Sequence, residues 1–193
     1  GLNGNNIKCF LVIDYDQDGD NDFFFANGTA IFNQMRRNNG EGIFEAIDGD
    51  TIGLDGGEGN GEVAAVADVD NDADPDIYYH VGTTVSLYYN DGDGTFSRGT
   101  GGLSREDGDS YQGAAFGDYD NDGYVDLYIS QGAGNESKLY QNDGDGTFTR
   151  QSSAAPDADH GENRDACWGD YDNDGDLDLF VAVDGGPNSL FRN

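Results

Sequence analysis

One acidic motif organises this chain: Asp170-Tyr171-Asp172-Asn173-Asp174-Gly175-Asp176-Leu177-Asp178. Aspartates occupy its positions 1, 3, 5 and 9, glycine occupies position 6, and the strand formers Leu179-Phe180-Val181 follow directly. Near-copies begin at Asp14, Asp68 and Asp118, so the four starts lie 54, 50 and 52 residues apart. A fixed period of about 50 residues is the signature of a repeat architecture.

Carboxylates packed this tightly repel one another unless a cation neutralises them. Calcium suits them, because it takes about six to eight oxygen ligands at roughly 2.3–2.6 Å and tolerates irregular geometry. The carboxylates at positions 1, 3, 5 and 9 can converge on one ion, and position 7 can offer its backbone carbonyl. Glycine at position 6 permits the sharp turn. The alternative is an acidic, solvated turn without an ion, but four copies of one pattern favour a calcium loop.

An EF-hand is excluded, because it needs a glutamate at position 12 and flanking helices. Position 12 is instead an apolar strand former in every copy: Phe25, Tyr79, Ile129 and Val181.

The second copy departs from the motif, since Ala73 replaces the glycine and Pro75 stiffens the loop. A Cβ opposes positive φ, so we expect this copy to bind calcium less tightly or with distorted geometry.

The composition is that of a globular protein. Of 193 residues, 35% are hydrophobic and 31 are glycine, while 11 tyrosines and 11 phenylalanines supply large core side chains. Thirty-nine acids against nine bases give a net charge of −30. That charge argues against nucleic acid and anionic membranes as partners. Four bound Ca²⁺ ions would add eight positive charges and leave about −22.

The expected location is extracellular, either secreted or at the cell surface. No apolar run is long enough to span a bilayer. The chain begins at Gly1 without a methionine or a signal peptide, as expected of a processed or trimmed start. Millimolar calcium outside cells suits modules that bind the ion weakly.

Two cysteines and two asparagines are candidate modification sites. Cys9 lies in the first repeat and Cys167 in the last, each just upstream of an acidic motif. They are either buried thiols or disulfide partners, within one chain or between neighbouring copies. Asn27 and Asn135 begin Asn-x-Thr and Asn-x-Ser signals, which makes them candidate glycosylation sites.

Each repeat predicts four short strands. The first is small and apolar, which suits a crowded, central position. The acidic motif joins it to a second strand that is apolar almost throughout. We therefore expect the second strands to be covered on both faces. In the first repeat the third strand is predicted at Ala30–Phe32.

A second turn, Asn142-Asp143-Gly144-Asp145-Gly146-Thr147-Phe148 in the third repeat, precedes each fourth strand and is a hairpin signal. We interpret it as plain turn chemistry, with a weaker ion site as the alternative. The fourth strands are predicted to begin at Gly42, Gly94 and Gly146.

The chain is interpreted as one repeat domain, residues 1–193, with repeats at about 7–53, 62–103, 111–154 and 164–193. The last repeat stops after its third strand, which leaves an edge that proteins normally cover. The missing strand would come from residues beyond 193, from another subunit or from Gly1–Asn6. We expect a chain that is part of something larger or that completes itself on a neighbour.

The two motifs together resemble FG-GAP/VCBS repeats, the family of the integrin α-subunit propeller. The resemblance rests on Ala115–Gly123 with Asp126–Ile129, and on Leu139–Phe148, and it covers nearly the whole chain. It implies an all-β fold of four-stranded β-propeller blades, with one Ca²⁺ in the hairpin between the first two strands of each blade. The implied carboxylate ligands are Asp14, Asp16, Asp18 and Asp22; Asp68, Asp70, Asp72 and Asp76; Asp118, Asp120, Asp122 and Asp126; and Asp170, Asp172, Asp174 and Asp178. The implied carbonyl ligands are Asp20, Asp74, Tyr124 and Asp176.

The number of blades leaves two arrangements open. Propellers of this family commonly have seven blades, whereas this chain holds four, the last one incomplete. Four blades can close a small ring, which would bring Cys9 near Cys167 within one chain. Alternatively the repeats stack head to tail as an open array or filament, and Cys167 of one copy meets Cys9 of the next.

The leading hypothesis is an extracellular, calcium-stabilised structural or adhesion repeat protein that assembles with copies of itself. The alternative is a lectin-like module of a longer chain that binds a protein or glycan, with Tyr111, Trp168 or His160 stacking on sugars. Such aromatic residues more often belong to the core. We expect no catalysis, because His80 and His160 lie in no nucleophile or metal motif, and His80 is interpreted as a packing or surface residue.

Overall fold

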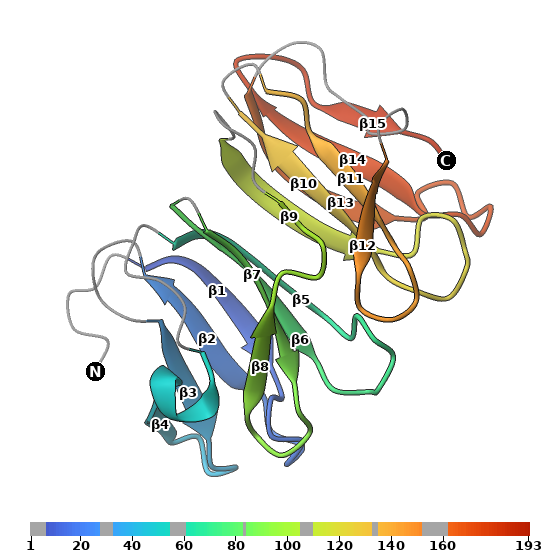
Figure 1. Ribbon diagram of the computed structural model, residues 1–193. Helices are drawn as coiled ribbons and strands as arrows, with labels where there is room; N and C mark the ends of the chain where they lie inside the picture. The colour runs from blue at the N-terminus through green and yellow to red at the C-terminus, as the bar shows by residue number, and fades with distance from the viewer. Residues whose placement is uncertain are drawn as a thin grey trace. The chain divides into compact units, whose positions relative to one another are not determined.

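The computed structural model describes residues 7–27, 33–54, 61–82, 84–104, 110–132, 135–151 and 162–193. This described part is all-β apart from one short 3-10 helix, η1 (Gly49–Ile52). Its strands form four small antiparallel sheets, three with four strands and one with three. These sheets are the propeller-type blades expected from the sequence (Figure 1).

Strand order within every sheet follows the sequence. The first blade contains β1 (Ile7–Ile13), β2 (Asp22–Asn27), β3 (Gln34–Asn38) and β4 (Phe44–Asp48). The second contains β5 (Gly61–Ala67), β6 (Asp76–Val81), β7 (Thr84–Asn90) and β8 (Phe96–Gly99). The third contains β9 (Tyr111–Gly117), β10 (Asp126–Gln131), β11 (Lys138–Asn142) and β12 (Phe148–Gln151). The fourth contains β13 (Glu162–Gly169), β14 (Asp178–Asp184) and β15 (Ser189–Phe191).

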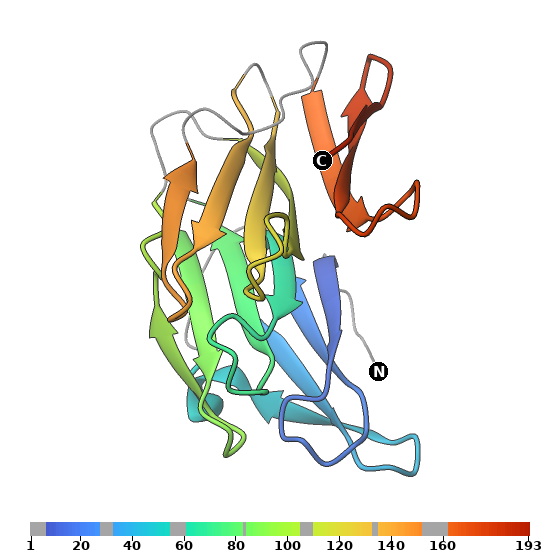
Figure 2. The same cartoon turned by 90° about the vertical axis from the view of Figure 1, so that its right-hand side faces the viewer.

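The blades group into two compact units, β1–β8 with η1 in the first and β9–β15 in the second. In the first unit β5 packs against β1 and β2, and in the second unit β13 packs against β9 and β10. Strands of one sheet lie side by side and twist together, as the turned view in Figure 2 shows. First strands therefore make the contacts between the two blades of each unit.

The third blade's first strand carries glycines where its neighbour approaches. A Cβ added to Gly117 in β9 would lie 2.6 Å from Cγ of Trp168 in β13. One added to Gly113 would lie 2.8 Å from Cα of Asp165. Real Cβ atoms do not approach other carbons this closely. The expectation that small residues mark a crowded first strand is confirmed.

Second strands are covered on both faces in the second and third blades. All six residues of β6 and all six of β10 are buried, which confirms the expectation from their apolar sequences. The first and fourth blades differ, because Phe23 and Phe25 in β2 are half-buried and Phe180 in β14 is 40% exposed. One face of β2 and one face of β14 thus lack full cover in the described part of the chain.

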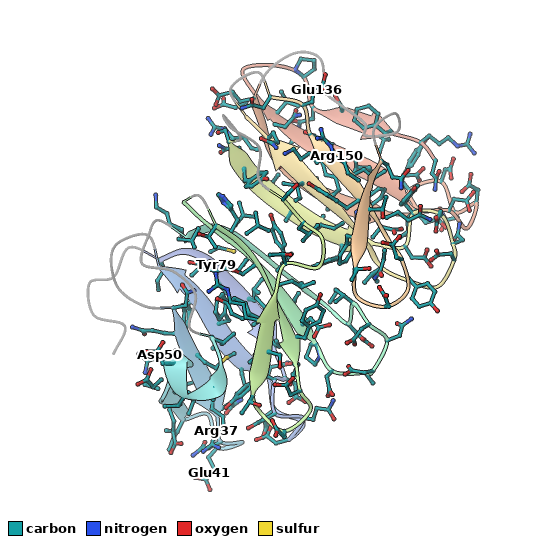
Figure 3. The ribbon with its side chains drawn as sticks, viewed as in Figure 1. Arg37, Glu41, Asp50, Tyr79, Glu136 and Arg150 are labelled. Carbon is teal, nitrogen blue, oxygen red and sulfur yellow. The ribbon has the colours of Figure 1, made fainter. Side chains whose placement is uncertain are left out.

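The core of the first unit joins its two blades. Phe24, Met35, Ile77 and Tyr79 are each 0% exposed and belong to one cluster. The rings of Phe24 and Tyr79 meet edge to face, with centroids 5.8 Å apart, an arrangement that aromatic pairs favour. Tyr79 lies inside this unit (Figure 3). Its hydroxyl donates to Oδ1 of Asn33 at 3.0 Å, and burial raises the pKa of Tyr79 to about 12.

The second unit repeats this design with other side chains. Tyr128 and Leu139 from the third blade pack with Leu179 and Val181 from the fourth. The ring of Trp168 meets Tyr128 edge to face, with centroids 6.4 Å apart. Large aromatic side chains therefore fill both cores, as the composition suggested.

Two strand predictions need correction. The third strand of the first blade is β3 (Gln34–Asn38), not Ala30–Phe32, which lies outside the described residues. The prediction chose Ala30–Phe32 because it is apolar. The strand must instead end at Asn38, where the turn between the third and fourth strands begins. The fourth strands begin two residues later than predicted, at Phe44, Phe96 and Phe148. The predicted glycines still belong to the turn, since their φ angles are positive: 76° at Gly42, 83° at Gly94 and 78° at Gly146.

Two sequence candidates, Gly1–Asn6 and His160, lie outside the described residues. Among the helices that the structure describes, none has the length and apolar character that crossing a membrane requires. Gly1–Asn6 as a source of the missing strand and His160 as a residue that stacks on sugars therefore remain predictions.

Candidate functional site

Each acidic motif forms the turn between the first and second strands of its blade. Two positions of this turn have left-handed backbone. Position 6 was expected, and φ there is 93° at Gly123 and 101° at Gly175 but 75° at Ala73. Position 4 was missed, although three of its four residues are asparagine, which tolerates this conformation best after glycine. Its φ angles are 55° at Gln17, 59° at Asn71, 60° at Asn121 and 60° at Asn173.

The turns bring carboxylates together in all four blades. In each turn three aspartates place oxygen atoms within 4.8 Å of one another. In the first and third turns these are positions 1, 3 and 5, and in the second and fourth they are positions 1, 3 and 9. The four groups are Asp14, Asp16 and Asp18; Asp68, Asp70 and Asp76; Asp118, Asp120 and Asp122; and Asp170, Asp172 and Asp178.

Backbone amides hold the position 1 carboxylate in place. Asp118 accepts hydrogen bonds from the amides of Asp122 at 3.1 Å and Gly123 at 3.0 Å. Asp170 accepts in the same way from Asp174 and Gly175, both at 3.1 Å. Aspartate side chains readily bond to nearby backbone groups in this way. The turn therefore fixes its own first carboxylate without help from the rest of the blade.

Position 9 has a structural role that the sequence did not reveal. Asp126 is 0% exposed, and its two oxygens accept from the backbone amides of Tyr119 at 3.0 Å and Asn142 at 2.9 Å. The former is position 2 of the turn and the latter ends the third strand. Asp178 repeats the pair with Tyr171 at 3.1 Å and Asn193 at 3.0 Å. This aspartate thus connects the acidic turn to the third strand.

The asparagine at the end of the third strand extends the connection to the preceding blade. In the first unit, Asn90 donates from its backbone to Asp76 at 2.8 Å. Its Nδ2 donates to the carbonyl of Tyr15, in the turn of the first blade, at 2.9 Å. In the second unit, Nδ2 of Asn193 donates to the carbonyl of Tyr119 in the same manner. One side chain therefore ties a turn to its neighbour.

Adjacent turns within a unit also touch directly. Nε2 of Gln17 donates to the carbonyl of Ala73 at 3.2 Å and to the side chain of Asp74. Nδ2 of Asn121 donates to Oδ1 of Asp176 at 2.7 Å. The position 7 side chains of Asp74 and Asp176 thus contact the turn of the neighbouring blade. The role of position 7 as a carbonyl ligand stays a prediction.

Burial makes the carboxylates costly to ionise. The pKa of Asp126 is raised to about 6, chiefly by burial, although the two backbone hydrogen bonds lower it. Burial also raises the pKa of Asp22. The pKa of Asp16 rises for the same reason, with repulsion from Asp18 as a second cause. A nearby cation would reverse these shifts.

The structure offers a test of whether a cation fits. Asp14 and Asp16 each have one buried oxygen, Oδ1, with no hydrogen-bond partner among the described residues. Asp172 has such an oxygen as well. Buried carboxylate oxygens without donors are unfavourable. Hard oxygen atoms that converge and lack donors are the ligands that calcium takes, so the residues fit the ion.

The fourth turn has an internal cation of its own. Arg192 lies 2.9 Å from Oδ2 of Asp172 and 2.7 Å from Oδ2 of Asp174, and it lowers the pKa of Asp174. Its side chain is 60% exposed, so these ion pairs contribute little to stability. Arg192 nevertheless makes the fourth turn less acidic than the others.

The other turn of each blade, between its third and fourth strands, is represented here by Asn142–Phe148 of the third blade. Ordinary hydrogen bonds satisfy its polar side chains. Oδ1 of Asn142 accepts from the amide of Gly144 at 2.9 Å. Oδ1 of Asp145 accepts from the hydroxyl of Thr147 at 2.6 Å and from its amide at 3.1 Å, which lowers the pKa of Asp145. These contacts favour plain turn chemistry over a second ion site.

The remaining candidates fall in different environments. Tyr111 is 1% exposed and His80 is 3% exposed, so both are packing residues. Trp168 is half-buried. Nδ2 of Asn135 donates to the carbonyl of Gly132 at 3.1 Å. The side chain of Asn27 lies outside the described part, and glycosylation remains a prediction for both asparagines.

Both cysteines are free thiols in the structure. Sγ of Cys9 donates to the carbonyl of Ala64 at 3.7 Å, whereas Cys167 is exposed. A disulfide between them remains a prediction.

Comparison with known proteins gives one family and one fold. Residues 14–79, 80–129 and 118–181 match the model of the FG-GAP-like repeat. No curated protein matches the chain. Among 37 matching chains of solved structures is a lectin of Agrocybe aegerita, solved to explain its specific recognition of non-reducing terminal N-acetylglucosamine.

The alignment with this lectin has 21% identity and a TM-score of 0.61, and it covers 93% of this chain and 50% of the lectin chain. At this identity the likeness concerns the fold alone. The chain spans about half the length of the lectin chain that it matches.

The left-handed residue at position 6 predicts opposite effects for two substitutions. No atom outside the neighbouring residues lies within 4 Å of a Cβ built on Gly123, so Gly123→Ala changes backbone strain alone. We expect it to lower the free energy of unfolding by about 1–2 kcal/mol. Ala73→Gly should raise it by about 0.5–1 kcal/mol, because glycine relieves strain but loses more entropy on folding. Urea denaturation at one fixed calcium concentration measures both, and equal stability of both variants and the parent would contradict the prediction.

Proposed function

This chain belongs to the FG-GAP-like repeat family, and on that premise we propose that it is an extracellular structural or adhesion module whose blades are stabilised by calcium. The observation that carries the proposal is the recurrence of one carboxylate cluster in the same turn of all four blades. Buried carboxylate oxygens in the first and fourth acidic turns, which have no hydrogen-bond partner among the described residues, support it. A catalytic role is not part of the proposal.

We assign the ligands by position in the turn. Carboxylates at positions 1, 3 and 5 would hold the ion, joined by position 9 in the second and fourth turns. The carbonyls of position 7 would complete the set. The ion supplies positive charge, which removes the repulsion among the aspartates and links its binding to folding. Because Ala73 is strained in the acidic turn of the second blade, we propose that this turn binds calcium more weakly.

The extracellular location rests on the same chemistry. Exposed, acidic turns of this kind suit the millimolar calcium found outside cells. A net charge of −30 keeps such a module soluble, and part of that charge would be neutralised by the bound ions.

Removal of calcium provides the direct test. A ligand at a hundred times its dissociation constant stabilises by about 2.7 kcal/mol per site. A domain of this size gains about 2–4 °C per kcal/mol. We therefore expect excess EGTA to lower the melting temperature by about 10 °C or more, and added calcium to restore it. The variant Asp120→Asn with Asp122→Asn should show a smaller calcium-dependent shift. A melting temperature indifferent to EGTA would count against the proposal.

We further propose that copies associate head to tail, because exposed faces of the fourth and first blades correspond to the two faces that are buried between the first and second blades. Phe180 and Leu190 are paired neighbours on β14 and β15, and they are 40% and 49% exposed. Phe24 and Met35 occupy the same register in the first blade and are both 0% exposed, since the second blade covers them. A blade of the same kind would therefore fit over Phe180 and Leu190.

The first blade offers the complementary face. Phe10 and Val12 on β1 are 59% and 47% exposed. Ala64 and Val66 hold the equivalent places on β5, counted back from the acidic turn, and pack into the core of the first unit. The occupant that we propose for each exposed face is the opposite face of a second copy.

If copies associate in this way, the mass of the particles in solution should depend on Phe180 and Leu190. We expect native mass spectrometry at micromolar concentration to show dimers and higher multiples of the chain. Phe180→Ser with Leu190→Ser should shift the distribution to monomer, because it removes the apolar contact. Ile43→Ser is the matched control, since Ile43 is 57% exposed but lies in a hairpin turn of the first blade. Monomers alone for the unaltered protein would overturn the proposal.

A second candidate function is glycan binding. The observation in its favour is the shared fold with the Agrocybe aegerita lectin over 93% of this chain. Of the three aromatic residues suggested for stacking on sugars, Trp168 is half-buried, whereas Tyr111 is buried in the core.

A glycan array tests this candidate. Selective binding to one class of terminal sugar, abolished by Trp168→Ala, would favour it. Absence of binding at millimolar sugar in the presence of calcium would leave the structural role as the preferred function.

A further inference from the structure

The residue that precedes the third-strand asparagine lies against the acidic turn of its own blade. In the third blade, Nε2 of Gln141 donates to Oδ2 of Asp120, at position 3 of the turn, at 2.6 Å. This blade has four paired strands, so the contact belongs to the complete blade. We call this place in the repeat the flanking position. Its four residues are Arg37, Tyr89, Gln141 and Arg192.

One hydrogen bond places the flanking position in the same way in every blade. The asparagine that follows it donates its backbone amide to the aspartate at position 9 of the turn, at distances between 2.7 and 3.0 Å. These asparagines are Asn38, Asn90, Asn142 and Asn193. A different residue at the flanking position therefore changes the charge beside the turn while the backbone stays in place.

The fourth blade carries a cation at the flanking position. Nε of Arg192 lies 2.9 Å from Oδ2 of Asp172, and Nη2 lies 2.7 Å from Oδ2 of Asp174. These two aspartates hold positions 3 and 5 of the turn. One guanidinium thus contacts two carboxylates of the turn and neutralises part of their charge. In the third blade Gln141 gives position 3 a hydrogen bond without a charge.

The first blade has an arginine whose charge is shared. Arg37, near the end of β3 (Figure 3), bonds to Oε2 of Glu45 at 2.9 Å, so Glu45 neutralises part of that charge. Burial raises the pKa of Asp16 at position 3, and the charge of Arg37 lowers it. Arg37 therefore acts on position 3 as well. In the second blade Tyr89 is neutral, and the strain at Ala73 sets that turn apart.

We propose that the flanking residue sets how tightly each acidic turn binds calcium, and that Arg192 is an internal counter-ion that competes with calcium for the fourth turn. This inference rests on the proposed calcium binding. An ion entering the fourth turn must displace Arg192 from two carboxylates or bind beside a like charge, and both lower its affinity. The third turn has Gln141 in place of this competitor. As calcium rises, the third turn therefore fills before the fourth.

Four backbone amides report on the turns one by one. At position 6 the amide donates to the carboxylate at position 1, at distances between 2.9 and 3.1 Å. An ion held by that carboxylate changes the chemical shift of the amide. Calcium titration of the full chain, followed by proton–nitrogen NMR correlation spectra, therefore yields one midpoint for each turn. The reporting amides are those of Gly19, Ala73, Gly123 and Gly175.

Exchange of the flanking residues tests the proposal. In the unaltered chain we expect the midpoint at Gly175 to lie at about tenfold higher calcium than the midpoint at Gly123, because a solvent-screened charge acts on the fourth turn alone. Arg192→Gln should lower the midpoint at Gly175 by about tenfold. Gln141→Arg should raise the midpoint at Gly123 by a similar factor.

Two controls separate the charge beside the turn from other effects. Arg192→Lys keeps the charge, so the midpoint at Gly175 should stay near that of the unaltered chain. Arg164→Gln removes an equal charge from the far end of the fourth blade and should leave every midpoint in place. Arg164 pairs at 2.7 Å with Asp184, the last residue of β14, whereas the acidic turn precedes the first.

Two different results would contradict the inference. Midpoints that move with neither exchange, in a chain whose amides respond to calcium, would overturn the role of the flanking residue and leave calcium binding intact. Amides that show no response to calcium in any turn would overturn the proposed calcium binding and this inference together.

Discussion

The structure depends on how the repulsion between aspartates in four hairpin turns is relieved. Each turn places three carboxylates within 4.8 Å of one another, at the start of a second strand that is fully buried in the second and third blades. Like charges at this distance favour protonation or a bound cation. Burial adds to this cost at position 9, where it raises the pKa of Asp126 to about 6. A calcium ion bound in the turn, as we propose, would remove this conflict and allow the turn and the buried strand behind it to coexist.

The turns matter beyond their own blade because hydrogen bonds connect them to the rest of the sheet. Asp126 joins position 2 of its turn to the end of the third strand. Asn90 carries the connection from the second blade to the turn of the first, and Asn121 links two adjacent turns in the second unit. An ion that orders one turn therefore also orders the surfaces by which neighbouring blades pack. This coupling gives a physical reason why a structural module would repeat the same acidic turn in every blade.

Much of the fold follows from the sequence, because the repeat and its hairpin chemistry are local. The blade type, the crowded first strands and the buried second strands were all predicted from residues within one repeat. The start of β3 was not, since Ala30–Phe32 has stronger strand character than Gln34–Asn38, and only pairing with Phe24 and its neighbours selects the latter. The roles of Asn90 and of position 4 depend on contacts between blades, which one repeat cannot reveal. A signal for them exists, because asparagine recurs at both places in most copies.

The central claim is that an ion sits inside each acidic turn, and anomalous X-ray diffraction from crystals grown with calcium tests it most directly. The account predicts one anomalous peak in each of the four turns, roughly 2.3–2.6 Å from the carboxylate oxygens of positions 1 and 3. The peak in the turn of Ala73 should be the weakest, because that turn holds a residue with a Cβ at φ 75°. Well-ordered turns whose aspartates surround only water would contradict the account.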